Sequence, residues 1–333
     1  MSGGGPVKPP AACIAFQVSV RKVRAVHPPG CCPEAGDGVL PRAMTIQATT
    51  TLASAHAGRD TVLEFASGLS NAARHRSAVS DIREGLHLWR LAWSLGWLDI
   101  RLRYRGSMLG PFWLTISTGV MVGSLGFLYS TLFHMSLREY LPFLALSQVL
   151  WGFLATLVSE SCTVFTEAET VLRSVRMPYF LFAMRVLVRN ALVLAHNACV
   201  IVVVFALLRI WPGSTAFLAL LALPLWIMNA LALSLLLGGF CARFRDIMPI
   251  VNSVMQIAFF LTPVIWKPEQ LGAGAVWLPL SPFFDLLEIV RAPLLGEVPS
   301  LQVWLGALLY SAALWAVAWA FFMRARGRIA FWI

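Results

Sequence analysis

Long apolar runs separated by short charged loops fill the last two thirds of this chain. A bilayer core of about 30 Å takes about 20 residues of helix, and six runs approach or exceed that length. They cover residues 112–133, 141–162, 179–208, 216–241, 249–265 and 301–323. Because backbone groups in lipid must be hydrogen-bonded within their own segment, the pattern predicts six transmembrane helices in an all-α integral membrane protein. A β-barrel would need alternating polar and apolar residues, and these runs are apolar on nearly every side.

The segment between the fifth and sixth runs, residues 267–300, is too apolar for a plain loop and too rich in proline and glycine for a span. We expect a short helix over 283–292, with Ser281 as its N-cap and Pro282 as its first residue. A re-entrant helical pair that enters the membrane from one side fits this composition. Asp285, Glu288 and Arg291 recur every three residues, which indicates charges on the surface of a helix.

A basic stretch leads into the first run. It reads WLDIRLRYRGSMLGPFWLTIS and covers residues 97–117, so its end overlaps the start of that run. Its alternating arginines alone would suggest a strand or a nucleic-acid patch. A wider window shows an apolar stripe at helical spacing, formed by Leu86, Trp89, Trp93, Trp97, Ile100 and Tyr104. This stripe predicts an amphipathic interfacial helix over 85–105, which ends at Gly106 and Gly110-Pro111. The guanidinium groups of this helix and its end, those of Arg101, Arg103 and Arg105, suit either lipid headgroups or the phosphate of a substrate.

The first 60 residues differ from the rest, with runs of glycine, proline and threonine and no continuous apolar stretch. This composition predicts a disordered N-terminal extension rather than a secretory signal. Met44 opens a more ordinary beginning. Residues 1–43 are therefore expected to be either an extension or the result of a misassigned start.

Composition excludes a soluble fold, since 58% of residues are hydrophobic and 13% are charged, against roughly 25% charged in soluble domains. The net charge of +10 comes mostly from arginine. In a soluble protein it would suggest nucleic acid; beside apolar runs it favours membrane lipids instead. The six cysteines show no metal-binding spacing.

The arginines divide unequally between the two sides of the predicted spans. One side carries Arg101, Arg103, Arg105, Arg173, Arg176, Arg243, Arg245, Arg324, Arg326 and Arg328. The other side carries Arg138, Arg209, Lys267 and Arg291. Because cytoplasmic loops are enriched in basic residues, both termini are expected in the cytoplasm and the re-entrant pair outside.

Recognisable enzyme chemistry is not found in the sequence. A P-loop lysine is followed by serine or threonine, and none of the three lysines is. If ATP is used, another chain must bind it. No span has an acidic residue near its middle, as ion-coupled transporters usually do. We therefore predict no catalytic, cofactor or metal site in this chain.

Five ordered motifs carry a resemblance to a known family. They are RLRYRGSMLGPFWLTIS, LRSVRMP after the second span, ARFRDI after the fourth, TPVIW at the end of the fifth and SPFFDLLEIVRAPLLG before the sixth. Over about residues 85–333 the chain resembles the membrane subunit of type-2 ABC exporters, the permeases for O-antigen, capsule or teichoic acid polysaccharides. The resemblance makes residues 106–333 the ABC-2 type transmembrane domain.

This resemblance implies a permease subunit of the bacterial inner membrane that moves a lipid-linked polysaccharide without changing it covalently. It implies a homodimer with two copies of a separate ATPase, which binds ATP and magnesium. It further implies a coupling helix seated on that ATPase, formed around Glu167, Glu169, Arg173 and Arg176.

The same resemblance implies two features along the export path. One is an outer gate in the re-entrant pair, with candidates Phe283, Phe284, Asp285, Glu288 and Arg291. The other is an aromatic channel lining on which sugar rings slide, with candidates Phe112, Trp113, Phe259, Phe260 and Trp266.

Alternatives stay open at this point. The aromatics equally suit lipid-facing positions, and the charged loops suit ordinary cytoplasmic loops. A type-2 ABC permease for a drug or a lipid fits the same motifs. A membrane glycosyltransferase or acyltransferase fits less well, because no pair of acids lies in a catalytic motif.

Overall fold

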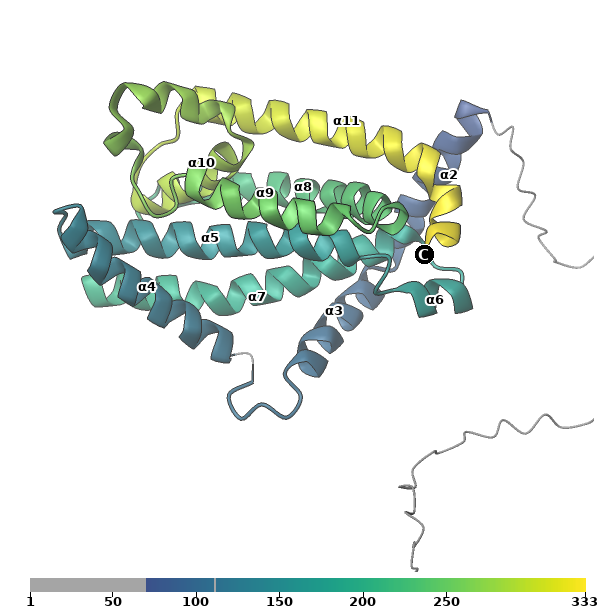
Figure 1. Ribbon diagram of the computed structural model, residues 1–333, viewed down its shortest axis with the longest axis horizontal. Coiled ribbons are helices and arrows are strands. Elements are labelled where there is room, and N and C mark those ends of the chain that lie inside the picture. The colour runs from purple at the N-terminus through teal and green to yellow at the C-terminus, as the bar shows by residue number, and fades with distance from the viewer. Residues whose placement is uncertain (1–69, 111) are drawn as a thin grey trace, which may run out of the picture. The chain divides into compact units, whose positions relative to one another are not determined.

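The computed structural model describes residues 70–110 and 112–333, and every regular element in these ranges is helical. The elements are α2 (Asn71–His87), α3 (Trp89–Arg103), α4 (Phe112–Leu132), α5 (Leu137–Thr163), α6 (Glu169–Ser174), α7 (Tyr179–Leu208), α8 (Ala216–Arg243), α9 (Ile247–Leu261), the 3-10 helix η1 (Pro268–Leu280), α10 (Pro282–Leu295) and α11 (Leu301–Trp332) (Figure 1). The prediction of an all-α membrane protein is confirmed. The extension predicted over residues 1–60 lies outside the described residues.

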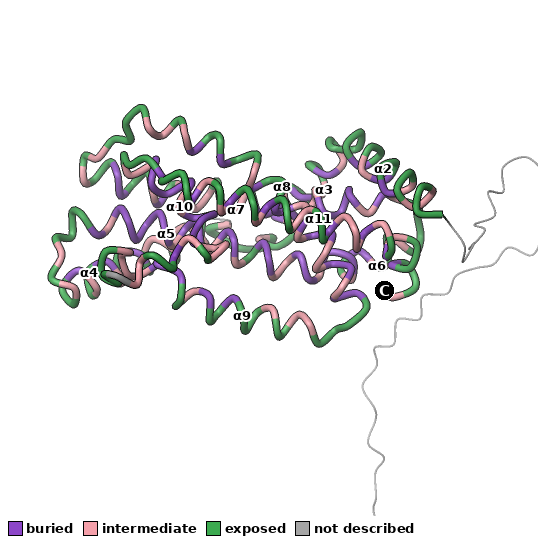
Figure 2. The backbone as a smooth tube through the Cα atoms, turned by 90° about the horizontal axis from the view of Figure 1, so that it is seen from above, coloured by how far each residue is buried: buried purple, intermediate pink, exposed green. Residues whose placement is uncertain are grey.

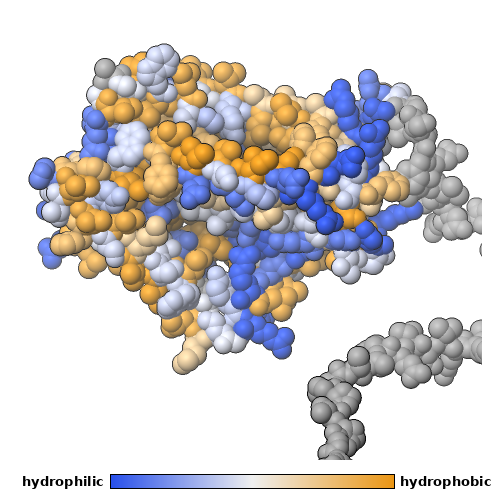
Figure 3. Space-filling model, in the orientation of Figure 1, coloured by the Kyte–Doolittle hydropathy of each residue, from blue (hydrophilic) through white to orange (hydrophobic). Residues whose placement is uncertain are grey.

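Five helices are long and apolar enough to cross a membrane: α4, α5, α7, α8 and α11. The remaining predicted run forms α9, which has 15 residues and rises only about 22 Å at 1.5 Å per residue. A sixth span therefore stays a prediction. On the face drawn in Figure 3, hydrophobic residues cover much of the middle, and hydrophilic residues gather toward the end with α2, α3 and α6.

Helix α5 lies at the centre of the helical bundle. It packs against α4, α7, α8, α9 and α10, and Figure 2 shows it buried along most of its length. Phe153 of α5 stacks on Trp226 of α8 with ring centroids 5.2 Å apart. A helix that is hydrophobic on all sides is expected to lie inside such an assembly. Its two ends reach the two regions in which charged side chains meet.

These regions are the α6 end, where α2, α6 and the end of α11 lie, and the α10 end, with α10 and η1 (Figure 1). At the α6 end, α3 packs closely along α7. A Cβ atom added at Gly96 of α3 would lie 2.8 Å from Cγ1 of Val188 on α7. Glycine is therefore what allows the two backbones to approach.

The interfacial helix predicted over 85–105 appears as the last turn of α2 followed by α3, with a break at Leu88. Three tryptophans of the predicted stripe, Trp89, Trp93 and Trp97, are exposed. The opposite face packs on α7, and its buried residues are Ala92, Gly96 and Ile100. Ile100 thus turns inward, whereas the tryptophans face outward as an interfacial helix requires.

Helix α2 was not expected from the sequence, and Asp81 fixes it to the bundle. The Asp81 side chain is fully buried and accepts hydrogen bonds from the backbone N–H groups of Tyr179 and Phe180, at 3.3 and 3.0 Å. It thereby caps the first turn of α7, whose N–H groups have no partner within the helix. Arg326 of α11 donates to the same carboxylate at 2.9 Å. One acid therefore joins α2, α7 and α11.

Helix α10 begins at Pro282 after Ser281, as predicted. It ends at Leu295, and the following Gly296 has a φ of 95°, a conformation that favours glycine after a helix. The prediction that the charges of this helix lie on its surface is wrong for Asp285 and Arg291. Asp285 and Arg291 are 2% and 1% exposed, because α10 packs between α5, α8 and α11.

Candidate functional site

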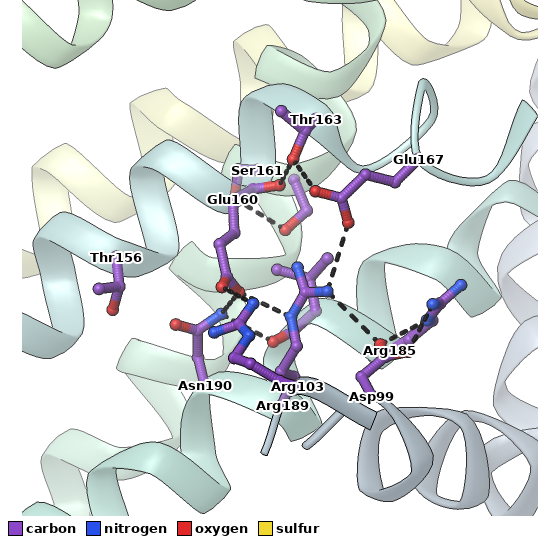
Figure 4. A network of polar contacts seen from close by, with 12 residues as sticks. Asp99, Arg103, Thr156, Glu160, Ser161, Thr163, Glu167, Arg185, Arg189 and Asn190 are labelled. Carbon is purple, nitrogen blue, oxygen red and sulfur yellow. Dashed lines mark hydrogen bonds and ion pairs between the residues drawn. The ribbon is translucent and has the colours of Figure 1, made fainter. Parts of the chain in front are cut away.

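Charged side chains from three helices and one loop meet at the α6 end (Figure 4). Helix α7 carries Arg185 and Arg189 one turn apart, on the side that faces α3 and α5. Arg185 forms a two-pronged ion pair with Asp99 of α3, at 2.7 Å and 2.6 Å. This paired geometry is the strong form of an arginine–carboxylate contact. It holds α3 against α7.

Arg189 lies at the centre of the cluster, with a side chain that is only 5% exposed. Its Nε donates to Glu160 of α5 at 2.8 Å. Its Nη1 is shared between Asp99 at 3.4 Å and Glu167 at 3.3 Å. Nη2 is buried and has no hydrogen-bond partner among the described residues. One guanidinium therefore contacts acids from α3, α5 and the loop after α5.

Glu160 joins this arginine to a second one. Its Oε1 accepts from Arg103 of α3 at 2.8 Å, and its Oε2 accepts from both Arg189 and Asn190. We call the set the α6-end network, made of Asp99, Arg103, Glu160, Glu167, Arg185 and Arg189. Three acids and three bases balance, which satisfies the requirement that buried charges be paired.

The four predicted coupling residues do not act as one group in the structure. Glu167 belongs to the network, and its Oε1 also accepts from Thr163 at 2.8 Å. Glu169 and Arg173 pair across one turn of α6 at 3.0 Å, and Arg173 also donates to the carbonyl of Ile333. Arg176 is exposed after α6. The segment thus presents charges outward while Glu167 ties it inward.

The three arginines predicted to meet phosphate are also divided. Arg103 is held by Glu160, although its side chain is 45% exposed. Arg101 and Arg105 are exposed, and no carboxylate within the described ranges pairs with them. These two arginines are therefore free to bind an anion from outside the chain, whereas Arg103 must first leave Glu160.

The predicted channel aromatics lie in two places. Phe259 and Phe260 of α9 line an open groove of about 370 Å³ with Trp151 of α5, and the Trp266 indole donates to the Phe260 carbonyl at 3.1 Å. Asn252 and Gln256 of α9 add polar groups to this groove. Its wall is therefore mixed aromatic and amide, a composition that suits sugars as well as lipid.

The other two candidates, Phe112 and Trp113, begin α4 and are both 59% exposed. Phe112 packs edge-on against His196 of α7, with ring centroids 5.9 Å apart. No ring contact joins this pair to the α9 aromatics in the part of the chain that the structure describes. A single chain does not bring the five together.

The predicted gate residues centre on Arg291. It donates to Glu288 one turn back, to the Ser147 hydroxyl at 2.9 Å and to the Pro263 carbonyl. Its guanidinium carbon lies 4.4 Å from the centre of the Phe143 ring. We call this the α10-end cluster, made of Phe143, Ser147, Pro263, Glu288 and Arg291. It joins α10 to α5 and to the segment after α9.

Asp285, Phe283 and Phe284 complete the predicted gate set. Phe283 packs on Trp151 at 5.6 Å between ring centroids, and Phe284 is buried. Asp285 is buried against α11, where a Cβ atom added at Gly306 would lie 2.1 Å from its Oδ2. These side chains are packed inside the subunit rather than free at its surface.

Comparison with known proteins identifies the family of this bundle. The profile described as ABC-2 type transporter matches residues 90–295. The chain belongs to the ABC-2 type transporter family. The match includes both charged clusters and the α9 groove, and it leaves out α2 and α11.

Individual relatives of this ABC-2 chain are distant and carry one name. The "O-antigen export system permease protein RfbA" of Myxococcus xanthus is 24% identical over 218 residues, which are 63% of this chain and 82% of that protein. A Klebsiella pneumoniae protein of the same name is 18% identical over 184 residues, 54% of this chain and 70% of that protein. The family prediction is confirmed.

The sequence reasoning missed several members of the ABC-2 chain's α6-end network. Asp99, Glu160, Arg185 and Arg189 were not among the predicted site residues. Two arginines one turn apart inside a long apolar run were the available signal, because charged residues there need partners. Which acids supply those partners depends on how α3, α5 and α7 pack, and no spacing in the sequence encodes it.

Proposed function

We propose that this chain is the membrane subunit of an ATP-driven exporter that moves a lipid-linked polysaccharide of the O-antigen class across the bacterial inner membrane. The observation that carries the proposal is the family match over residues 90–295, together with relatives named as O-antigen export permeases in two bacterial species. The substrate class rests on those names.

The proposed exporter contains two copies of this chain and two copies of a separate ATPase, which holds ATP and magnesium. The chain's three lysines lack the sequence context of a P-loop, which supports a separate motor. The proposed docking element is the segment from Glu167 to Arg176. Its short helix α6 is exposed, and no residue of α6 is buried.

The proposed topology has six spans, with both termini in the cytoplasm at the α6 end and with η1 and α10 as a re-entrant pair from the outside. Helix α9 would cross together with residues 262–266, since alone it is shorter than the hydrocarbon core. The arginine distribution supports this orientation.

The proposed channel lies between the two copies. One face of α9 has exposed apolar residues at helical spacing, Ile250, Val254, Ile257 and Leu261, and a second copy would cover this face. The α9 groove and the exposed Phe112 and Trp113 would then line a path for sugar rings, because stacking on aromatic faces does not fix a sliding polymer in one register. Arg101 and Arg105 would receive the phosphate of the lipid carrier.

The decisive experiment purifies the tagged full chain from its native host and identifies what comes with it. We expect an ATPase chain in equal amount, and ATP-dependent transfer of lipid-linked glycan when the complex is placed in proteoliposomes. Deleting this chain should remove the surface glycan, and restoring it should bring the glycan back. Normal surface glycan in the deletion strain would refute the proposal.

A further inference from the structure

The Nη1 atom of Arg189 lies almost equally far from two acids, at 3.4 Å from Asp99 and 3.3 Å from Glu167. Both contacts are longer than the 2.8 Å bond from Nε to Glu160. Nη1 carries two hydrogens and can donate to both carboxylates, but both contacts are longer than an ordinary N–H···O bond of about 2.9 Å, so the nitrogen lies between the two acids and close to neither. Arg189 of α7 is thus held by a short bond to α5, and its Nη1 atom makes two longer contacts, one to α3 and one to the loop after α5.

The two competing acids differ in how freely they can move. Asp99 is 13% exposed and is also fixed by Arg185. Glu167 is 48% exposed and belongs to the segment that leads into α6. If that segment shifts, Glu167 is the acid that leaves Arg189, because its other hydrogen-bond partner is Thr163, only four residues earlier in the chain. Arg189 Nη1 is then free to close on Asp99.

A change in this contact would act on α3, which carries the exposed tryptophans and, at its end, Arg101 and Arg103. Asp99 and Arg103 are the charges by which α3 enters the network. A shorter Arg189–Asp99 contact would hold α3 more tightly on α7. Small shifts are converted into discrete changes in this way when a packed element has two alternative arrangements.

We propose that Glu167 and Asp99 compete for Arg189, so that displacement of the 164–176 segment tightens the hold of α7 on α3. Arg189 is then a positioning residue, which acts on the interfacial helix through Asp99. The inference rests on the proposed function in one respect, that the ATPase is what displaces the segment. The competition itself is a property of this chain alone.

The test replaces Glu167 by glutamine, which removes its charge with little change in size. Glu139→Gln is the matched control, because Glu139 is at the other end of α5 and also pairs with a distant base, Lys267, at 2.7 Å. The first measurement is hydrogen–deuterium exchange over residues 97–105 in the full-length chain. We expect slower exchange in Glu167→Gln than in wild type, and no change in Glu139→Gln.

The sign of that result separates competition from simple stabilisation. If Glu167 only stabilised the fold, its removal would loosen α3, and exchange would become faster. Faster or unchanged exchange in Glu167→Gln would therefore overturn the proposal. This measurement needs no ATPase, so it tests the competition separately from the proposed function.

The second measurement is glycan exported per ATP hydrolysed by the reconstituted complex. Coupling between sites typically corresponds to factors of about 5–150, and we expect Glu167→Gln to lower this ratio at least about fivefold in complexes that hold the same amount of ATPase as the wild type. Glu167→Asp keeps the charge and should retain most of the ratio. An unchanged ratio in Glu167→Gln would overturn the link to transport, whereas absence of an ATPase from the wild-type preparation would overturn the proposed function.

Discussion

The two ends of α5 each lead to a buried arginine, and the two arginines have opposite kinds of surroundings. Arg189 at the α6 end contacts acids from three different parts of the chain, at sequence separations of 22 to 90 residues. Arg291 at the α10 end pairs with one acid, Glu288, three residues away on its own helix. Its other contacts are neutral groups on α5 and on the segment after α9.

Exposure separates the two clusters further. The α6-end network has two half-exposed members, Arg103 and Glu167, so events outside the bundle can reach the buried Arg189. In the α10-end cluster the Arg291 side chain is 1% exposed and Glu288 is 17% exposed. The difference shows that a buried ion pair can either hold two helices rigidly together or transmit a movement from one to another. A closed cluster, in which a buried base has one acid and little exposure, holds its helices in place. An open cluster, with competing acids and half-exposed members, can transmit movement.

The largest effect is expected from breaking the closed cluster. Arg291→Met leaves Glu288 partly buried without its partner and removes the donors that reach Ser147 and Pro263. Removing one partner of a buried pair costs about 3–5 kcal/mol, so the variant should fail to accumulate in the membrane. Membrane abundance and a detergent melting curve measure this.

A second variant separates the ion pair of Arg291 from its neutral contacts. Replacing both charges, as Glu288→Met with Arg291→Met, leaves no unpaired charge and should recover most of the lost stability. If the double variant is as unstable as Arg291→Met alone, then the neutral contacts of Arg291, rather than the ion pair, fasten α10.

A smaller effect on stability and a clear effect on coupling are expected from Arg189→Lys. Lysine keeps the charge near Glu160, but a compact ammonium lacks the planar fork that reaches three acids. Changes along a coupling network typically alter it by about 0.5–2 kcal/mol. We expect the variant to reach the membrane and hydrolyse ATP with its partner while export per ATP falls. If the variant exports as much glycan per ATP as the wild type, the contacts of Arg189 only hold the helices together and do not transmit movement.

The sequence predicted the helices of this fold better than the contacts between them. Apolar runs gave the five long helices, and Ser281 with Pro282 gave the start of α10, because these signals are local. The prediction that Asp285 and Arg291 are surface charges was wrong for the same reason. A three-residue spacing shows that charges share a helix face, but whether that face is covered depends on α5, α8 and α11.

The α6-end network illustrates what local patterns omit. Arg103 and Glu167 were singled out from their neighbourhoods, one in a basic stretch and the other in a charged loop. Their connection runs through Glu160, near the end of the second apolar run, and Arg189, inside the third. Asp81 is a similar case, since its role as the cap of α7 depends on a helix that the sequence did not reveal.

The exposed arginines provide a milder test of the same comparison. Arg101→Gln with Arg105→Gln removes two charges that no described acid holds, so membrane abundance and melting temperature should not change. If they receive carrier phosphate, export should fall a few-fold, since exposed charge pairs contribute little each. Arg103→Gln, which removes the donor to Oε1 of Glu160 and leaves Oε2 with Arg189 and Asn190, is the matched comparison. Equal export and equal exchange of α3 in both variants would show that the network contact of Arg103 has no separate role.

The smallest effect is expected at the pair of the exposed Glu139 and the partly buried Lys267 near the α10 end. The two atoms are 2.7 Å apart, yet the Glu139 side chain is 63% exposed, and exposed pairs are weakened by water and salt. Glu139→Gln should therefore leave melting temperature, α3 exchange and export per ATP unchanged. The pair spans 128 residues of sequence, which is farther than any contact of the α6-end network, whose largest separation is the 90 residues between Asp99 and Arg189. A coupling defect in this variant would show that sequence-distant ion pairs matter regardless of burial, and the distinction between open and closed clusters would then lose its physical basis.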